Sequence, residues 1–184
     1  MKNSKALTRC LLTASIGIFA TAALAGLLGA RVNTTGSYPP GLYWLTGEEP
    51  RKGALVIACP PDVEAVAEGF RRGYIGAGFC PGGYGYVIKK IVGLPGDRVT
   101  VTGQGVSVNG EAIPNSTLRE ADSMGNPLPL REAAFTLGTA QVLLMSDYSP
   151  KSFDGRYFGP IEQTGIKGVL RPVFTMGLPA KSPG

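Results

Sequence analysis

Residues 10–30, near the start of the chain, carry no charged side chain. About 20 apolar residues, rising ~1.5 Å each in a helix, are long enough to cross the hydrocarbon core of a bilayer. Basic residues precede this stretch at Lys2, Lys5 and Arg9, and only Arg31 follows it closely. Such an asymmetry places the more basic flank in the cytoplasm. The sequence therefore predicts a cytoplasmic N-terminus at 1–9, a transmembrane anchor at 10–30, and an exported domain.

A second interpretation of the same stretch is a signal sequence that is removed after export. Ala23-Leu24-Ala25 resembles the small-residue pattern of a cleavage site. The stretch is long for the apolar part of such a signal, which favours an uncleaved anchor. Under both interpretations residues 31–178 form a domain outside the cytoplasm, and residues 179–184 are expected to be a flexible tail.

Glycine and proline are frequent, with 27 and 15 residues, and this favours a turn-rich β structure over a helical bundle. Strands are expected at 42–45, 53–59, 86–92, 98–102, 141–145 and 166–176, with an Asn-Gly hairpin at 106–113. One short helix is expected after Pro60-Pro61, with Asp62 as its N-cap and Gly73 just past its end. Residues 31–37 are expected to be a polar link and 115–131 a polar loop. The predicted fold class is mainly β, with an N-terminal transmembrane helix and one short helix.

Cys59 and Cys80 bracket the predicted short helix. In an oxidising compartment outside the cytoplasm, they are candidates for a disulfide. A bond that closes a loop of this size contributes about 3 kcal/mol in the chain-entropy model. The alternative, two free thiols, stays open on the sequence alone.

Histidine is absent from the chain. A Ser-His-Asp or Cys-His site therefore cannot form from this chain alone. The usual zinc ligand is missing, and three separated cysteines do not supply a four-cysteine metal site. A phosphate-binding Gly-x-x-x-x-Gly-Lys-Ser/Thr loop is also missing. We expect neither a cofactor nor a metal, and a hydrolase of this composition needs a carboxylate or a lysine as its base.

The net charge of +5 does not indicate nucleic-acid binding. Three of the basic residues precede the apolar stretch, with no acidic residue among them. The rest of the chain has no basic stripe with interleaved aromatic residues, which is the usual footprint of a nucleic-acid site. We therefore expect no nucleic acid among the partners.

Candidate catalytic residues lie in two separate stretches. Ser37 is in a turn bounded by Gly36 and Pro39-Pro40, close to the end of the apolar stretch, although most turn serines are only turn residues. In the strand 86–92, side chains alternate between two faces, so Lys89 and Lys90 point to opposite sides. One lysine is expected to be solvated and the other buried or snorkelling. The alternation alone does not choose between them.

Three segments, in this order, resemble the sequence boxes of the signal peptidase I family of Ser–Lys proteases. They are Ser37-Tyr38-Pro39-Pro40-Gly41, then Lys89 to Asp97, then Ser152 to Gly159. The small size, the single anchor and Cys80-Pro81-Gly82-Gly83 look most like the TraF branch, conjugative-transfer peptidases that mature a pilin precursor. The chain departs from the wider family at Asp147-Tyr148-Ser149 and at Gly155. These departures weaken the case for a general leader peptidase.

The resemblance implies a fold and residue roles. The fold is a coiled antiparallel β-sheet or partial barrel. Ser37 is the nucleophile, and Lys89, the first lysine of its box, is the base. Thr35, through its hydroxyl, and the backbone N–H of Ser37 are the oxyanion donors, and Ser152 orients the lysine. Asp154 and Arg156 form a scaffold ion pair, with an acid–base role for Asp154 as the alternative.

A lysine can act as a base only in its neutral form. At its ordinary pKa, only ~0.04 % of a lysine is neutral at pH 7. Burial among apolar side chains such as Val87 and Ile91 disfavours the ammonium and lowers this pKa. The scheme therefore requires Lys89 to be buried.

The resemblance also implies partners and a location. The substrate is a pilin precursor or another exported preprotein, processed with or without cyclisation during plasmid transfer by type IV secretion. The location is the bacterial inner membrane, with the catalytic domain on the periplasmic face, or the periplasm if the anchor is cleaved. Two alternatives stay open: a housekeeping leader peptidase with broad Ala-x-Ala substrates, and an inactive anchored component of a secretion channel.

Overall fold

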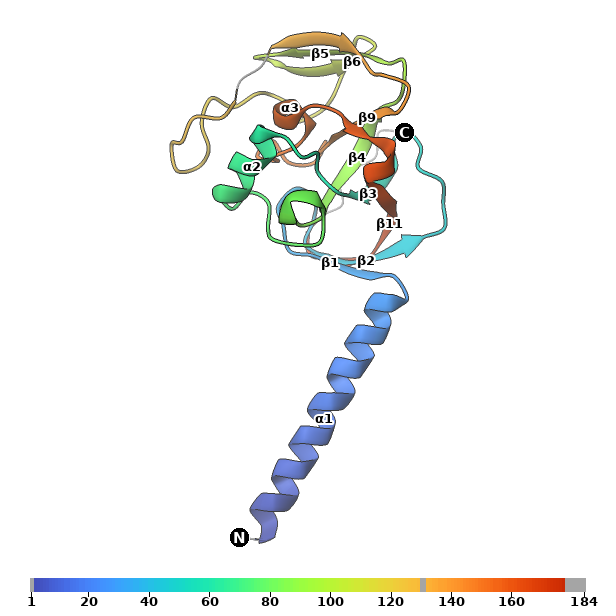
Figure 1. Cartoon of the computed structure of the whole chain (residues 1–184), viewed down its shortest axis with the longest axis vertical. Coiled ribbons are helices and arrows are strands. Elements are labelled where there is room, and N and C mark those ends of the chain that lie inside the picture. Colours follow the sequence, from blue (N-terminus) through green and yellow to red (C-terminus); the bar gives the residue numbers. More distant parts are fainter. Residues whose placement is uncertain (1, 130–131, 178–184) are drawn as a thin grey trace.

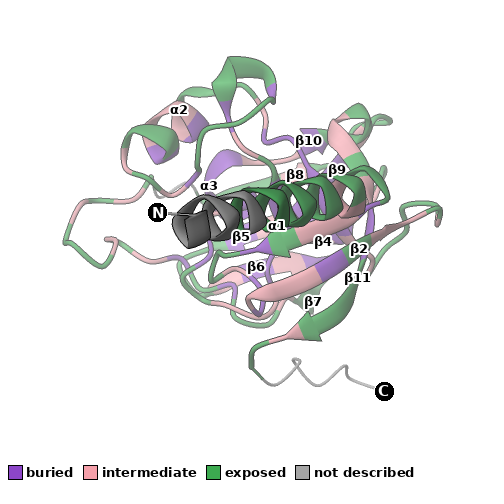
Figure 2. Cartoon of the chain, turned by 90° about the horizontal axis from the view of Figure 1, so that it is seen from below, coloured by how far each residue is buried: buried purple, intermediate pink, exposed green. Residues whose placement is uncertain are grey.

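The computed structural model describes residues 2–129 and 132–177, with side chains from residue 11 onward. Helix α1 (Lys2–Leu27) extends away from a mainly β domain (Figure 1). Its side chains from 11 to 24 are exposed (Figure 2). Measured by length and hydropathy together, none of the helices in the described part of the chain qualifies as a membrane-crossing segment.

A seven-stranded antiparallel sheet forms the body of the domain. The strand order is β1-β2-β11-β3-β4-β9-β10, and β1 and β10 are its free edges. The strands are β1 (Ala30–Asn33), β2 (Gly41–Thr46), β3 (Leu55–Ala58), β4 (Val87–Gly93), β9 (Gln141–Met145), β10 (Ile161–Glu162) and β11 (Ile166–Thr175). The register shifts at three places, two in β11 and one in β4, and such bulges bend and twist a sheet. The prediction of a mainly β, antiparallel fold is confirmed.

A smaller four-stranded sheet lies at the end of the domain far from α1 (Figure 1). Its order is β7 (Glu111–Ala112), β6 (Gly105–Val108), β5 (Arg98–Thr102) and β8 (Ala133–Thr136). Asn109 and Gly110 both have positive φ, as a two-residue hairpin turn requires, so the predicted Asn-Gly hairpin is confirmed. Valines of β5 and β6 pack against Val92, Leu143 and Met145 in one core, which joins the two sheets.

Short helices cover one side of the larger sheet. They are α2 (Glu64–Arg71) and α3 (Gly155–Phe158), with 3-10 turns at Pro81–Gly83 and Gln163–Gly165. The prediction of Asp62 as N-cap is wrong: Val63 occupies that position without a side-chain hydrogen bond. Asp62 instead accepts a hydrogen bond from the hydroxyl of Tyr84 at 3.4 Å. The predicted end of α2 is confirmed, because Gly73 follows it with a φ of 76°.

The polar link predicted at 31–37 is wrong for its first half. Residues 30–33 form β1 and pair with β2. The junction with α1 is short, and the Arg31 guanidinium donates hydrogen bonds to the carbonyls of Gly26, at 2.7 Å, and Ala30, at 2.8 Å. The backbone N–H of Leu45 also donates to the carbonyl of Gly29. The start of β1 is therefore fixed both to the last turn of α1 and to β2.

The loop and the tail predicted from the sequence lie partly outside the residues that the structure describes. The loop predicted at 115–131 contains an isolated bridge between Ala121 and Pro127, and no helix or strand is found between 115 and 129. Residues 130 and 131 lie outside the described residues, as do 178 and the predicted tail at 179–184. Strands β8 and β10 were not predicted, because one is mostly exposed and the other has only two residues.

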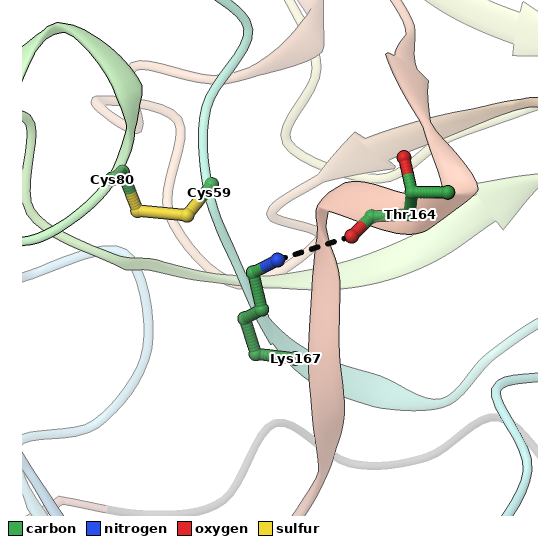
Figure 3. Close-up of a disulfide and its surroundings, with 4 residues drawn as sticks. All are labelled: Cys59, Cys80, Thr164 and Lys167. Atoms are coloured by element: carbon green, nitrogen blue, oxygen red, sulfur yellow. Dashed lines mark hydrogen bonds between the residues drawn. A yellow bond between two sulfur atoms is a disulfide. The ribbon is translucent and has the colours of Figure 1, made fainter.

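The sulfur atoms of Cys59 and Cys80 form a disulfide with an S–S distance of 2.11 Å. It joins the end of β3 to the segment that follows α2, and both cysteines are buried. Figure 3 shows the bond beside Lys167, whose ammonium donates to the carbonyl of Thr164 at 3.1 Å. The segment that carries α2 is thus tied to the larger sheet at both ends.

We expect the double variant Cys59→Ala/Cys80→Ala to lose about 3 kcal/mol of unfolding free energy, because the unfolded chain gains the freedom of the opened loop. Urea denaturation with and without a reductant measures this loss. The reductant should destabilise the wild type and leave the double variant unchanged. A wild type that is insensitive to the reductant would contradict the prediction.

Candidate active site

The turn that carries Ser37 is folded around the side chain of Asn33, the last residue of β1. Asn33 is buried, and its Nδ2 donates hydrogen bonds to the carbonyls of Thr35, Tyr38 and Pro39 at 2.9–3.2 Å. Its Oδ1 accepts from the backbone N–H and from the hydroxyl of Thr35 at 3.0 and 2.8 Å. One amide therefore satisfies five polar groups of the turn and fixes its shape.

The exit from this turn requires glycine. Gly41 begins β2, and a Cβ on it would lie 2.2 Å from the carbonyl oxygen of Phe174 in β11. Its φ of 154° also lies in a region that other residues rarely adopt. The close approach of β2 to β11 at this point sets where the chain leaves the turn. The family box that places a glycine four residues after the serine therefore has a local steric cause.

Lys89 reaches Ser37 from β4, in the middle of the larger sheet. It pairs with Val56 of β3, and its Nζ lies 2.7 Å from Oγ of Ser37. Only 3 % of Lys89 is exposed, and this burial lowers the pKa of its ammonium from 10.5 to about 8. The Asp154 carboxylate raises this pKa and Arg156 lowers it, both by less than the effect of burial. A substantial fraction of Lys89 is therefore neutral near pH 8 and able to accept a proton.

Lys90 points to the other side of β4, as strand alternation requires. It forms an ion pair with Asp147, and the hydroxyl of Tyr38 donates to the same carboxylate at 2.7 Å. Burial, followed by the charge of Asp147, raises the pKa of Tyr38 far above its ordinary value. Of the two adjacent lysines, Lys89 contacts the candidate nucleophile Ser37. Lys90 instead holds Asp147, which binds the hydroxyl of Tyr38, the residue after Ser37.

Ser152, in the loop between β9 and α3, also contacts Ser37. It is buried, and its hydroxyl donates to Oγ of Ser37 at 3.1 Å. The resemblance implies that this serine orients the lysine. Within the described residues its hydrogen bond is to Ser37, and none joins it directly to Lys89. Both groups that the resemblance places around the nucleophile thus contact its hydroxyl.

Asp154 and Arg156 form an ion pair whose side chains are fully buried. The carboxylate accepts from Nε and Nη2 of Arg156 at 2.8 and 3.0 Å, and from the backbone N–H of Ser146 at 3.0 Å. The guanidinium also donates to the carbonyls of Asn115 and Thr117, which belong to a distant loop. The pair thus contacts backbone groups of three segments, and its predicted scaffold role stays a prediction.

Ser146, which was not among the predicted site residues, connects this ion pair to Ser37. Its hydroxyl donates to the carbonyl of Ser37 at 2.6 Å and accepts from the backbone N–H groups of Tyr148 and Ser149. Its own N–H is held by Asp154. The only sequence signal is its place at the start of the polar turn after a buried strand, and a serine there is not unusual.

A cleft of about 350 Å³ opens beside Ser37 and Lys89. Its lining includes residues 31–35 and residues 85–89. Thr35 lies in this lining, with its hydroxyl donated to Asn33, so its predicted role as an oxyanion donor stays a prediction. The Ser37 N–H has no acceptor among the residues described. Those residues also contain no cluster of His, Cys, Asp or Glu side chains that could hold a metal.

The family model described as signal peptidase, peptidase S26, matches residues 6–175. The chain belongs to this peptidase family. The resemblance inferred from the three sequence boxes is thereby confirmed. A plasmid transfer protein TraF of Escherichia coli is 52% identical to the chain over 165 residues, covering 88% of the chain and 93% of that protein.

More distant relatives are also similar over most of the chain. A conjugal transfer protein TraF of Agrobacterium fabrum is 36% identical over 165 residues, which are 86% of the chain and 90% of that protein. Among solved structures, a signal peptidase I from Enterococcus faecalis is 19% identical with a TM-score of 0.40, and covers 68% of the chain and 100% of its own.

We expect Lys89→Met to stabilise the protein at pH 7 by about 1–3 kcal/mol, because a buried ammonium is replaced by an apolar side chain of similar length. The folded-state pKa is depressed, so the folded protein binds fewer protons than the unfolded chain above pH 8. The stability of the wild type therefore rises between about pH 8 and 10.5, and the advantage of the variant shrinks there.

Urea unfolding at several pH values measures this advantage. Lys90→Met is the matched control, since it leaves Asp147 without its cation and should destabilise. The prediction fails if the two substitutions change the unfolding free energy equally. It also fails if the stability gained by Lys89→Met does not change above pH 8, because the fold would then not disfavour the charge of Lys89.

We expect Asn33→Asp to lower the unfolding free energy by about 1–3 kcal/mol, because three backbone carbonyls lose their donor and face a carboxylate. Displacement of Ser37 should also slow its labelling by a fluorophosphonate roughly tenfold or more. Mass spectrometry measures the labelling rate. The exposed neighbour Thr34 provides the control variant Thr34→Ala, and equal rates for the two variants would argue against a role of Asn33 in shaping the turn.

Proposed function

We propose that the chain is a serine endopeptidase in which Ser37 is the nucleophile and Lys89 the general base. The observation that carries this proposal is the 2.7 Å contact between Oγ of Ser37 and the nearly inaccessible Nζ of Lys89. A nucleophile in hydrogen-bond contact with a base of lowered pKa is the arrangement that covalent catalysis needs. The absence of histidine leaves lysine as the base that this site can offer.

The proposed reaction has two halves. Oγ of Ser37 attacks the scissile carbonyl as neutral Lys89 takes its proton, and the resulting ammonium then protonates the leaving amine. The Ser37 N–H and the Thr35 hydroxyl would stabilise the oxyanion; one such donor is typically worth about 3 kcal/mol of barrier. In the second half, Lys89 takes a proton from the incoming nucleophile as this attacks the acyl group, and returns the proton to Oγ of Ser37 as that oxygen leaves.

The incoming nucleophile decides the product. Water gives a cleaved, linear peptide, whereas an amine gives a new amide bond. If that amine is the N-terminus of the same substrate, the product is cyclic and one water lighter than the linear one. We propose a pilin precursor of a conjugation apparatus as the substrate. The support is that relatives matching most of the chain, at 52% and 36% identity, are named as plasmid and conjugal transfer proteins.

We also propose that α1 anchors the peptidase in the bacterial inner membrane, with the catalytic domain on the periplasmic face. The support is the uncharged stretch 10–30, the basic residues before it, and the exposure of apolar side chains along α1, including Leu11, Ile16 and Phe19. Retention in the pellet after alkaline carbonate extraction tests this proposal. Release of an intact chain into the soluble fraction would argue against it.

We expect both Ser37→Ala and Lys89→Ala to abolish processing of a candidate pilin co-expressed with the peptidase. The first removes the attacking oxygen and the second the base. Intact-mass measurement of the pilin reports cleavage, and a loss of one further water reports cyclisation. Lys167→Ala, at an exposed lysine outside the cleft, is the lysine control, and immunoblotting checks that all variants are present at equal levels.

Each outcome separates the functions. Processing that survives Ser37→Ala would overturn the mechanism and favour a component of a secretion channel. Processing of many unrelated exported preproteins, with the pilin among the poorer substrates, would favour a housekeeping leader peptidase. Loss in both variants with a specific pilin product supports the proposed pilin peptidase.

A further inference from the structure

A second cavity of about 170 Å³ lies next to the cleft of Ser37 and Lys89. We call it the side pocket. Two aromatic residues, Tyr74 and Phe153, line both the side pocket and the cleft, so their rings form a shared wall. The other walls of the side pocket include Arg119, Met124, Leu128 and Tyr157. A peptide bound in the cleft would therefore have the side pocket beside it.

The shared wall is held in place and lies close to the nucleophile. Phe153 follows Ser152, whose hydroxyl is 3.1 Å from Oγ of Ser37. The centre of the Phe153 ring lies 5.3 Å from that of the Tyr74 ring and 5.6 Å from that of the Tyr157 ring. Helix α2 lies directly behind it, since a Cβ on Gly69 would be 2.7 Å from the Phe153 ring. The position of this wall is thus fixed relative to the reacting serine.

The rim of the side pocket comes from the loop between β7 and β8, which is tied down at two points. The backbone N–H of Arg119 donates to the hydroxyl of Tyr157 at 3.2 Å. The Asp122 carboxylate accepts from the hydroxyl of Tyr74, from the side chain of Asn126 at 2.8 Å, and from backbone N–H groups. Asp122 therefore holds the loop, and because these bonds lower its pKa it stays a charged carboxylate in the lining of the side pocket.

The charge of the side-pocket lining is positive on balance, with two basic side chains against the one carboxylate of Asp122. Arg119 and Lys151 both line the side pocket, and neither side chain has an acidic partner among the residues that the structure describes. Met124, also at the rim, is 75% exposed. The combination of apolar walls with two unpaired cations fits an apolar side chain that has a carboxylate close by.

We propose that the side pocket is a substrate subsite that receives an apolar side chain of the peptide, with an adjacent aspartate or glutamate contacting Arg119 and Lys151. This inference rests on the proposed peptidase function and names a feature of its substrates. It makes the side pocket a determinant of which bond is cut, separate from the groups that perform the reaction.

The test uses the full-length protein in detergent and a peptide spanning the processing site of the pilin. Glutamate, glutamine and lysine are placed in turn at each of four positions on either side of the scissile bond. For the wild type we expect one position where glutamate gives a KM roughly fivefold below glutamine, with kcat little changed, as expected for partly exposed ion pairs. Lysine at that position should give a KM above that of glutamine, and added salt should reduce the differences in KM among the three peptides.

The variant Arg119→Glu/Lys151→Glu should reverse this order, so that lysine becomes the preferred residue at the same position. Lys167→Glu is the matched control, because it reverses an exposed lysine that lies outside the side pocket and should keep the order of the wild type. A second variant, Ser123→Trp, fills the side pocket from an exposed position and should raise KM for peptides with a large apolar residue next to the acid.

The outcomes separate the two proposals. If Ser37 reacts with a fluorophosphonate and the peptides are cleaved, but no position prefers an acid or the order survives charge reversal, the side pocket is not a subsite and the peptidase function stands. If neither labelling nor cleavage of any peptide occurs, the peptidase function fails and the subsite with it.

Discussion

The buried ion pair between Asp154 and Arg156 holds together the segments that surround Ser37. Two opposite charges removed from water are stable only when their hydrogen bonds are nearly complete, and here the carboxylate and guanidinium contact backbone groups of the loops near 115, 146 and 154. Removing one partner of such a pair typically costs about 3–5 kcal/mol. The contact of Ser146 with the carbonyl of Ser37 depends on this arrangement, because Asp154 holds the backbone of Ser146.

The two lysines of β4 show how alternation along a strand separates two electrostatic environments. Lys90 forms an ion pair with the Asp147 carboxylate, and its side chain is 30% exposed. Lys89 is buried beside a hydroxyl, and its nearest charged neighbours, Asp154 and Arg156, act on its pKa in opposite directions. Burial lowers the pKa of Lys89 because the loss of hydration of the ammonium outweighs the stabilising charge of Asp154. The base proposed for catalysis thereby comes at a cost in stability.

The features predicted correctly from the sequence are those with a local cause. The strands have apolar patterns, the hairpin has its Asn-Gly turn, and the three boxes identify the family. Asn33 was missed although its hydrogen bonds are local, because a lone Asn before a turn carries no specific signal. Ser146 was missed because its contact with Ser37 joins residues far apart in the chain. The N-cap at Asp62 failed because Tyr84, brought near by the disulfide, engages that carboxylate instead.

The strand β1 was also unexpected, because an exposed edge strand containing Arg31 and Val32 has no apolar alternation. Its presence changes how α1 relates to the nucleophile. The helix passes into β1 through two residues, Arg31 donates to carbonyls on both sides of the junction, and Asn33 folds the next turn. No flexible tether separates the helix from Ser37. If α1 is the membrane anchor proposed above, this short junction limits how far Ser37 lies from the membrane surface. The bond presented to Ser37 would then depend on how many residues the substrate extends from that surface.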